Sequence, residues 1–140
     1  MKTLFLLRHA KSDWSDPGLT DDQRPLNHRG KRVAPGMGKK LGELGAFPDM
    51  IICSTAVRAV ETLNYAGKEM KVDFNNVVYA DDLYGASTST LLSLICGFEE
   101  EADSAMLVGH NPGLTAVAGK FLCGFPRAVD AVIVASPTHE

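Results

Sequence analysis

The chain has 140 residues, 45% of them hydrophobic, which is enough for one packed core and too short for two ordinary domains, so we expect a single domain over residues 1–140. The formal net charge of −3 at pH 7 argues against a nucleic-acid partner, and no apolar run is long enough for a membrane span or a signal-peptide core. We therefore expect a cytoplasmic protein that binds neither nucleic acid nor membrane. Its three widely spaced cysteines predict free thiols. Residues 1–40 nonetheless hold nine Lys or Arg against four acids, a local excess that suits either an anionic ligand or solvated helix charges.

Strand and helix patterns alternate from the first residues onward. A strand is predicted over residues 3–8, and the polar loop over 11–25 that follows is long enough to be functional. The next segment predicts a helix that Asn27 caps and Gly45 ends. Pro35 within this segment predicts a late start, a kink or a short turn before the main helix. The buried face of the helix is expected to carry four apolar residues, Val33, Met37, Leu41 and Leu44.

The same alternation continues through the second half of the chain. Further strands are predicted over 50–53, 77–79, 105–109 and 131–135. Further helices are predicted over 58–71, around Leu91 to Ile95, and after an Asn111 cap with Pro112 as the first helical residue and Leu114, Val117, Ala118 and Phe121 buried. This order predicts an α/β fold, a three-layer α/β/α sandwich around a central, mostly parallel sheet.

Cationic or potentially cationic side chains follow the ends of three predicted strands. Arg8 and His9 end the first strand, Arg58 follows the strand over 50–53, and His110 follows the strand over 105–109. Because polar groups at the carboxyl ends of parallel strands face one crevice, we expect these four side chains to meet. Two guanidinium groups and two imidazoles around one crevice suit a phosphoryl group.

His9 is the candidate nucleophile of this crevice. A neutral imidazole attacks phosphorus through its unprotonated nitrogen, so the other nitrogen must hold its proton against an acceptor such as a backbone carbonyl. Arg8 and Arg58 would hold the phosphoryl oxygens during transfer, and His110 would add a donor if protonated. A non-catalytic phosphate-binding module would present a similar pocket, although the complete set of four residues favours turnover.

Five stretches of the chain resemble the histidine phosphatase superfamily, also called phosphoglycerate mutase-like, and within it the small SixA-type phosphohistidine phosphatases. They are LLRHAKSDW (6–14), RPLNHRG (24–30), CSTAVRAVET (53–62), LYGAS (83–87) and VGHNPG (108–113). The resemblance implies that His9 is transiently phosphorylated, that Arg8, Arg58 and His110 complete the phosphate pocket, and that no metal or other cofactor takes part. Ala10 departs from the typical glycine of the family, a replacement that is common in the small branch.

The proton donor has two candidate locations. Larger relatives carry an acid between the second arginine and the second histidine, where this chain offers Asp81 and Asp82. We favour Asp21 or Asp22 of the long loop, with solvated turn residues as the remaining interpretation. A phosphoramidate on histidine can leave as neutral imidazole once its second nitrogen is protonated, so a site poor in acids favours an N–P substrate over an unactivated phosphate ester.

The spacing of the motifs also bears on the substrate. Only 51 residues separate Arg58 from His110, which leaves no room for a cap subdomain. An open pocket could admit a phosphohistidine on another protein, so we expect a phosphorylated protein as the partner, with a small phosphate ester as the alternative. Ser12, Trp14 and Tyr84 are candidate substrate contacts, and packing on the sheet edge is the alternative for the two aromatic residues.

Two other kinds of site fit the sequence less well. A cysteine phosphatase would use Cys53 and Arg58, but only four residues intervene where that loop needs five, and none is glycine. A metal site built from His9, His110 and Asp13 lacks ligand spacing, and the two arginines would repel a cation.

Overall fold

The computed structural model describes residues 3–96, 103–111, 113–122 and 131–136, and its centre is a five-stranded sheet. The strands are β1 (Thr3–Arg8), β2 (Met50–Ser54), β3 (Val77–Ala80), β4 (Ser104–Gly109) and β5 (Ala131–Ala135). They lie in the order β3-β2-β4-β1-β5, and every neighbouring pair is parallel. The predicted strands and the predicted α/β class are therefore confirmed.

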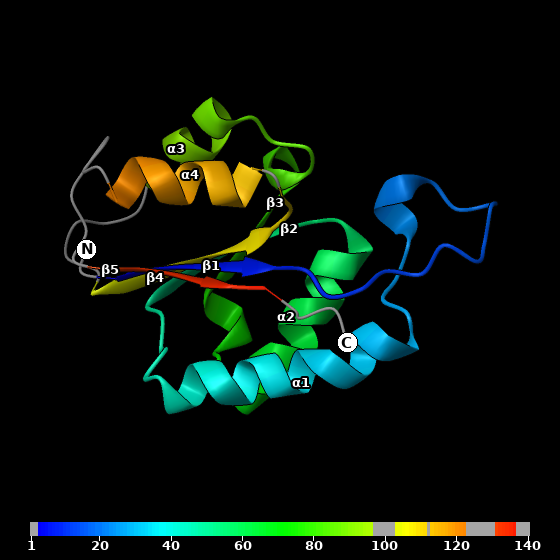
Figure 1. The fold of residues 1–140 in the computed structure, drawn as a ribbon, viewed down its shortest axis with the longest axis horizontal. Coiled ribbons are helices and arrows are strands. Elements are labelled where there is room, and N and C mark those ends of the chain that lie inside the picture. Colours follow the sequence, from blue (N-terminus) through cyan, green and yellow to red (C-terminus); the bar gives the residue numbers. More distant parts are fainter. Residues whose placement is uncertain (1–2, 97–102, 112, 123–130, 137–140) are drawn as a thin grey trace.

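Helices cover both faces of the sheet. They are α1 (His28–Glu43), α2 (Val57–Glu69), α3 (Thr88–Cys96) and α4 (Gly113–Leu122), with three short 3₁₀ turns η1 (Asp21–Gln23), η2 (Phe74–Asn76) and η3 (Asp81–Leu83) between strands and helices. Figure 1 shows α1 and α2 together on one face and α3 and α4 on the other, which is the predicted three-layer sandwich. Pro112 and the side chain of Phe121 lie outside the described residues. None of the described helices is long and apolar enough to cross a membrane.

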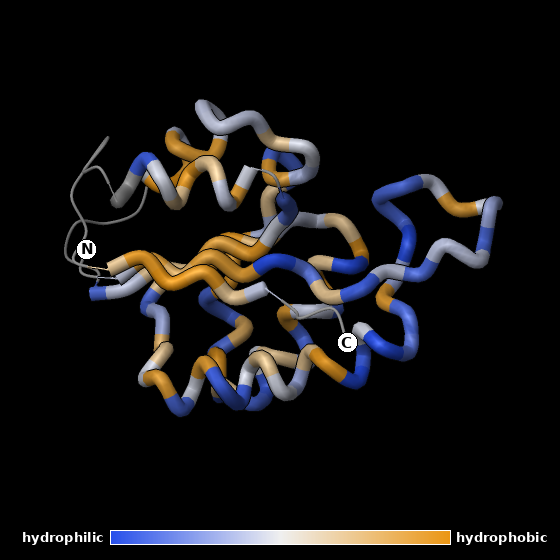
Figure 2. Tube along the Cα trace, viewed as in Figure 1, coloured by the Kyte–Doolittle hydropathy of each residue, from blue (hydrophilic) through white to orange (hydrophobic). Residues whose placement is uncertain are grey.

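The central strands are apolar on both faces because each face is covered. Along β1, Leu4 and Leu6 pack in the cluster that includes residues of α3 and α4, whereas Phe5 and Leu7 pack in the cluster that includes residues of α1 and α2. Figure 2 shows the strands of the sheet as a continuously hydrophobic part of the chain, whereas hydrophobic and hydrophilic residues alternate along α1. A strand buried on both faces is read as a continuous apolar run, which explains why these strands could be located from the sequence.

Helix α1 starts at the predicted cap. It begins directly after Asn27, whose side chain accepts a hydrogen bond from the Gly30 amide at 2.8 Å, and it continues through Pro35. The Asn27 cap is therefore confirmed, and the late start or separate short turn that Pro35 suggested is wrong. Proline removes only one intrahelical donor, and the cap and the packing of α1 against α2 stabilise the helix around it.

The buried face of α1 is also rotated from the predicted one. Small residues form most of it, namely Gly30, Ala34 and Gly38, together with Leu41. Of the large residues predicted to be buried, Val33 and Met37 are half-buried and Leu44 is 59% exposed. A Cβ atom at Gly38 would lie 2.1 Å from the Ala66 carbonyl oxygen, so the two helices cross at a distance that only glycine permits.

Candidate active site

The order of the strands brings the predicted site residues to one edge of the sheet. β4 lies between β1 and β2, with Arg8 opposite Gly109 and Cys53 opposite Val108. The His9 amide donates to the Gly109 carbonyl at 3.0 Å, so His9 and His110 leave their strands at the same level. Their ring centroids are 5.1 Å apart. Arg58 reaches this edge from the first turn of α2.

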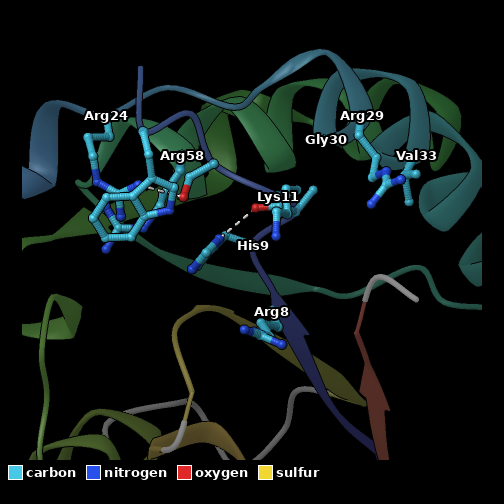
Figure 3. Close-up of a pocket in the computed structure, with 11 residues that line it drawn as sticks. Arg8, His9, Lys11, Arg24, Arg29, Gly30, Val33 and Arg58 are labelled. Carbon is cyan, nitrogen blue, oxygen red and sulfur yellow. Dashed lines mark hydrogen bonds between the residues drawn. The ribbon is translucent and has the colours of Figure 1, made fainter. Parts of the chain in front are cut away.

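A cavity of about 390 Å³ opens beside His9. Five side chains with fixed positive charge line it, namely Arg8, Lys11, Arg24, Arg29 and Arg58. Figure 3 shows His9 among these side chains, with Arg8 and Arg58 on different sides of the ring. Two of the guanidinium groups carry a buried Nε atom, in Arg8 and Arg58, without a hydrogen-bond partner among the described residues. Such a lining suits an anion with several acceptor oxygens.

His9 has one ring nitrogen in a hydrogen bond and the other available for reaction. Its Nδ1 atom lies 2.7 Å from the carbonyl oxygen of Ala10, which is an acceptor, so Nδ1 carries the proton and Nε2 holds a free lone pair. Burial, together with the charges of Arg58, Arg8 and Arg24, lowers the pKa of His9 to about 4, against the opposing effect of the Ala10 hydrogen bond. His9 is therefore neutral at pH 7, in the form that attacks phosphorus.

His110 contacts its hydrogen-bond partner through the other ring nitrogen, Nε2. Its Nε2 atom lies 2.9 Å from the hydroxyl oxygen of Ser54, a fully buried residue at the end of β2. The Ser54 oxygen also accepts the Ala56 amide at 3.2 Å. A serine hydroxyl can both donate and accept, and when it donates to His110 Nε2 the ring proton of His110 lies on Nδ1. Nδ1 is buried and has no partner among the residues that the structure describes.

The sequence predicts that His110 adds a donor if it is protonated, but the structure favours a neutral ring. Burial, the neighbouring titratable ring of His9 and the charge of Arg58 together lower its pKa to about 4, against the opposing effect of Asp21. The imidazole is thus neutral at pH 7, and any donation from Nδ1 is that of a neutral N–H group. His110 lines an adjoining hollow of about 350 Å³ between η3 and α4 rather than the cavity beside His9.

Asp21 bonds to Arg24 of its own loop and connects the loop to two other parts of the site, Arg58 of α2 and Tyr84. Its carboxylate accepts hydrogen bonds from Arg24 Nη2 at 2.9 Å, from Arg58 Nη2 at 3.0 Å and from the Tyr84 hydroxyl, and its backbone carbonyl accepts from Arg58 Nη1 at 2.7 Å. The Tyr84 hydrogen bond, followed by those from Arg24 and Arg58, lowers the pKa of Asp21 to about 2. The carboxylate is therefore ionised at pH 7 and holds no proton.

The other candidate acids lie apart from the cavity. Asp22 accepts from the Thr20 hydroxyl at 2.6 Å within its own loop, and Asp81 accepts from the Thr55 hydroxyl at 2.6 Å. Neither of them, nor Asp82, lines the cavity beside His9.

The predicted substrate contacts are placed by Arg24 and Asp21. Arg24, a buried residue, donates to the Ser12 hydroxyl at 2.9 Å and lies with its guanidinium carbon 3.4 Å from the centroid of the Trp14 ring. Trp14 is 73% exposed and lines the cavity, so it does not pack on the sheet edge. Tyr84 lies with its ring edge-on to His110 at 5.7 Å between centroids and donates to Asp21.

Several supporting residues were missed in the sequence analysis. Thr62 is fully buried, accepts from the Ala10 amide at 2.9 Å and donates to the Arg58 carbonyl at 2.7 Å, which joins the His9 segment to α2. Glu61 accepts from the Leu26 amide at 2.8 Å. Arg24 and Ser54 complete this group. The spacing of Thr62 four residues after Arg58 on one helix face was the available signal.

The structure does not favour the other two kinds of site that the sequence offers, a cysteine-phosphatase site and a metal site. Cys53 is fully buried, and burial raises the pKa of its thiol to about 12, which disfavours the thiolate that a cysteine phosphatase uses. Among residues 3–96, 103–111, 113–122 and 131–136, no group of three or more His, Cys, Asp or Glu side chains could hold a metal ion.

Comparison with known proteins places this geometry in a family. Residues 4–83 match the sequence pattern of the Histidine phosphatase superfamily (branch 1). The chain is 37% identical over 112 residues to the uncharacterised protein Rv1276c of Mycobacterium tuberculosis, a match that covers 80% of this chain and 67% of that protein.

Two further similarities concern proteins that are named for a phosphatase activity. The crystal structure of the protein from Agrobacterium tumefaciens named "putative phosphohistidine phosphatase SixA" superposes with a TM-score of 0.76 and 37% identity over 85% of this chain and 76% of that one. The mitochondrial serine/threonine-protein phosphatase Pgam5 of Drosophila ananassae is 40% identical over 75 residues, which cover 54% of this chain and 25% of that protein. The chain belongs to the histidine phosphatase superfamily, and within it to the SixA type.

Proposed function

We propose that this protein is a metal-independent phosphatase that removes the phosphoryl group from phosphohistidine in another protein. The observation that carries the proposal is the state of His9, a neutral imidazole with Nδ1 bonded to the Ala10 carbonyl and Nε2 free, between the guanidinium groups of Arg8 and Arg58. The SixA structure from Agrobacterium tumefaciens and the protein phosphatase Pgam5 support a phosphorylated protein as the substrate.

The proposed reaction has two displacements at phosphorus. In the first, His9 Nε2 forms a bond to phosphorus while the N–P bond of the substrate breaks, and the substrate histidine leaves as neutral imidazole because its other nitrogen carries a proton. In the second, a water oxygen attacks phosphorus and the bond to Nε2 breaks. Dihydrogen phosphate leaves with both protons of the water, and His9 is neutral again. Arg8, Arg58 and the Nδ1–H group of His110 stabilise the charge on the phosphoryl oxygens in both steps.

The acids of the site support an N–P substrate over an unactivated ester. An alkoxide leaving group needs a proton as it departs, and the carboxylate of Asp21 is ionised at pH 7 because its pKa is about 2. We assign Asp21 to the positioning of Arg58 and Arg24 rather than to proton donation. A small phosphate ester with a good leaving group remains the second candidate substrate, and Ser12, Trp14 and Tyr84 would then border it.

The decisive experiment compares wild-type protein with His9→Ala on two substrates, a phosphohistidine-containing phosphotransfer protein and an aryl phosphate. We expect wild-type protein to hydrolyse the first, to acquire an acid-labile phosphoryl label on His9 and to remain active with a chelator present, and we expect His9→Ala to lose the label and about 10⁴-fold or more in rate. A wild-type protein that binds phosphate without turnover would support the non-catalytic module. High activity on the aryl phosphate alone would support the small ester.

A further inference from the structure

The cavity beside His9 has more positive charge than one phosphoryl group requires. Five cationic side chains line it, and no Asp or Glu is among the described residues of the lining. Asp21 neutralises one of these charges through its ion pairs with Arg24 and Arg58. A phosphoryl group brings about two negative charges at neutral pH, so about two positive charges are left without a counterion.

Two of the five cations stand apart from the rest of the lining. Lys11 and Arg29 are exposed, and neither side chain has an ion pair or hydrogen bond within the described part of the chain. In the view of Figure 3, Arg29 lies on the opposite side of His9 from Arg24 and Arg58, with Lys11 between His9 and Arg29. The cavity therefore extends past His9 to a second group of cationic side chains, Lys11 and Arg29. We call this part of the lining the second cationic wall.

The backbone holds Lys11 and Arg29 on this wall together. The Lys11 carbonyl accepts the Asn27 amide at 2.9 Å, which ties the segment after β1 to the start of α1. A Cβ atom at Gly30 would lie 2.3 Å from the same carbonyl oxygen, so the first turn of α1 packs directly on Lys11. Because Arg29 is the neighbour of Gly30 in α1, this contact places the Arg29 side chain on the same wall of the cavity as Lys11.

We propose that Lys11 and Arg29 form a second anion subsite, which binds a carboxylate side chain, Asp or Glu, close to the phosphohistidine of a substrate protein. The proposal rests on the proposed function, since it concerns the surroundings of the same reacting group. Fixed cations favour a carboxylate over a neutral amide of the same shape, and the cavity is of the size that accommodates more than a single phosphoryl group.

The test uses two chemically phosphorylated peptides and one small N–P compound. One peptide carries phosphohistidine flanked by Asp, the second carries Asn at the same positions, and phosphoramidate serves as the substrate without any flanking group. We expect wild-type kcat/KM to be about tenfold higher for the Asp peptide than for the Asn peptide. Arg29→Gln should reduce this preference to about one to three, and Lys11→Gln should reduce it in the same direction.

Arg32→Gln is the matched control, because Arg32 is an exposed arginine of α1 that does not line the cavity. It should keep the wild-type preference for the Asp peptide. Hydrolysis of the Asn peptide reports that each variant is folded and active, since the preference is a ratio measured on the same preparation. Equal kcat/KM for both peptides with wild-type protein, or an unchanged preference in Arg29→Gln, would overturn the subsite. No hydrolysis of any of the three compounds would instead overturn the proposed function, and the subsite with it.

Discussion

A histidine follows each of the strands β1 and β4, and the two histidines have different hydrogen-bond partners. His9 and His110 are both partly buried, and burial and neighbouring charges lower both pKa values to about 4. The hydrogen-bond partners differ, because a backbone carbonyl that can only accept lies against Nδ1 of His9, whereas a serine hydroxyl that can also donate lies against Nε2 of His110. The first contact leaves a lone pair free on His9, and the second, when the hydroxyl donates, leaves the Nδ1–H group of His110 free.

The two histidines therefore differ in their hydrogen-bond partners and not in their pKa values, and we assign their proposed roles from the partners. A nitrogen with a free lone pair can attack phosphorus, and a neutral N–H group can donate to a phosphoryl oxygen but cannot attack it. Because the two rings are 5.1 Å apart, one phosphoryl group could lie within reach of both.

After the loss of His9 itself, the largest effect is expected for substitutions that separate the two nitrogens of His110. The amide nitrogen of Asn is as many bonds from Cα as Nδ1 is, and that of Gln is as many as Nε2 is. We therefore expect His110→Asn to remain within about tenfold of the wild-type kcat, and His110→Gln to lose about 10² to 10³-fold, the usual effect of removing a donor to a developing oxyanion. Steady-state hydrolysis of phosphoramidate measures both.

Ser54→Ala provides the control for this pair of variants. Removing the hydroxyl frees His110 Nε2 in otherwise wild-type protein, and we expect a loss of about tenfold in kcat. The same substitution should have no further effect on activity in His110→Asn, since Asn does not reach Ser54, so the two changes should be non-additive. More activity in His110→Gln than in His110→Asn would show that Nε2 is the donor and that the assignment is reversed.

The meeting of the two histidines could be predicted from the sequence, but their partners could not. Continuous apolar runs locate strands buried on both faces, and the parallel arrangement then places His9 and His110 at one edge. The contact between His110 and Ser54 depends on the register of β4 against β2, which the strand patterns leave open. The ionised state of Asp21 likewise depends on donors from three separate segments, namely Arg24, Arg58 and Tyr84.

Helix α1 shows a second limit of the sequence pattern. Its period was read from its large apolar residues, and this placed Leu44 inside, where the structure exposes it. The face is instead set by Gly38, which meets the backbone of α2, so close helix packing outweighs the burial of a leucine at the helix end. Small residues carry little hydrophobic signal, which is why the pattern missed them.

The next largest effect concerns Asp21, for which positioning and proton donation give different results. We expect Asp21→Asn to lose about tenfold in kcat/KM, because the ion pairs that orient Arg58 and Arg24 are replaced by weaker hydrogen bonds. The loss should be equal for aryl phosphates with good and with poor leaving groups, since Asp21 holds no proton. A loss that grows as the leaving group becomes more basic would instead make Asp21 the proton donor.

Asp22→Asn is the matched control for that experiment. Asp22 is the next residue in the same loop and bonds only to the Thr20 hydroxyl among the described residues. Its substitution should change kcat/KM by less than about twofold, as expected for an exposed side chain outside the cavity.

The smallest effect is on the free energy of unfolding, and it tests the lowered pKa that the two histidines have in common. At pH 8, well above the ordinary pKa of 6.5, the imidazoles are neutral in the folded and the unfolded chain, so this source of pH dependence vanishes. As the pH falls from 6.5 towards 4, only the unfolded chain binds the proton, and the free energy of unfolding decreases by about 1 to 2 kcal/mol per histidine at pH 5. Denaturant unfolding of wild-type protein and His9→Gln at pH 5 and pH 8 should show a smaller pH dependence in the variant. His28→Gln, which replaces an exposed histidine of α1, should keep the wild-type dependence, and an equal dependence in all three proteins would mean that His9 accepts a proton in the folded state as easily as in the unfolded one.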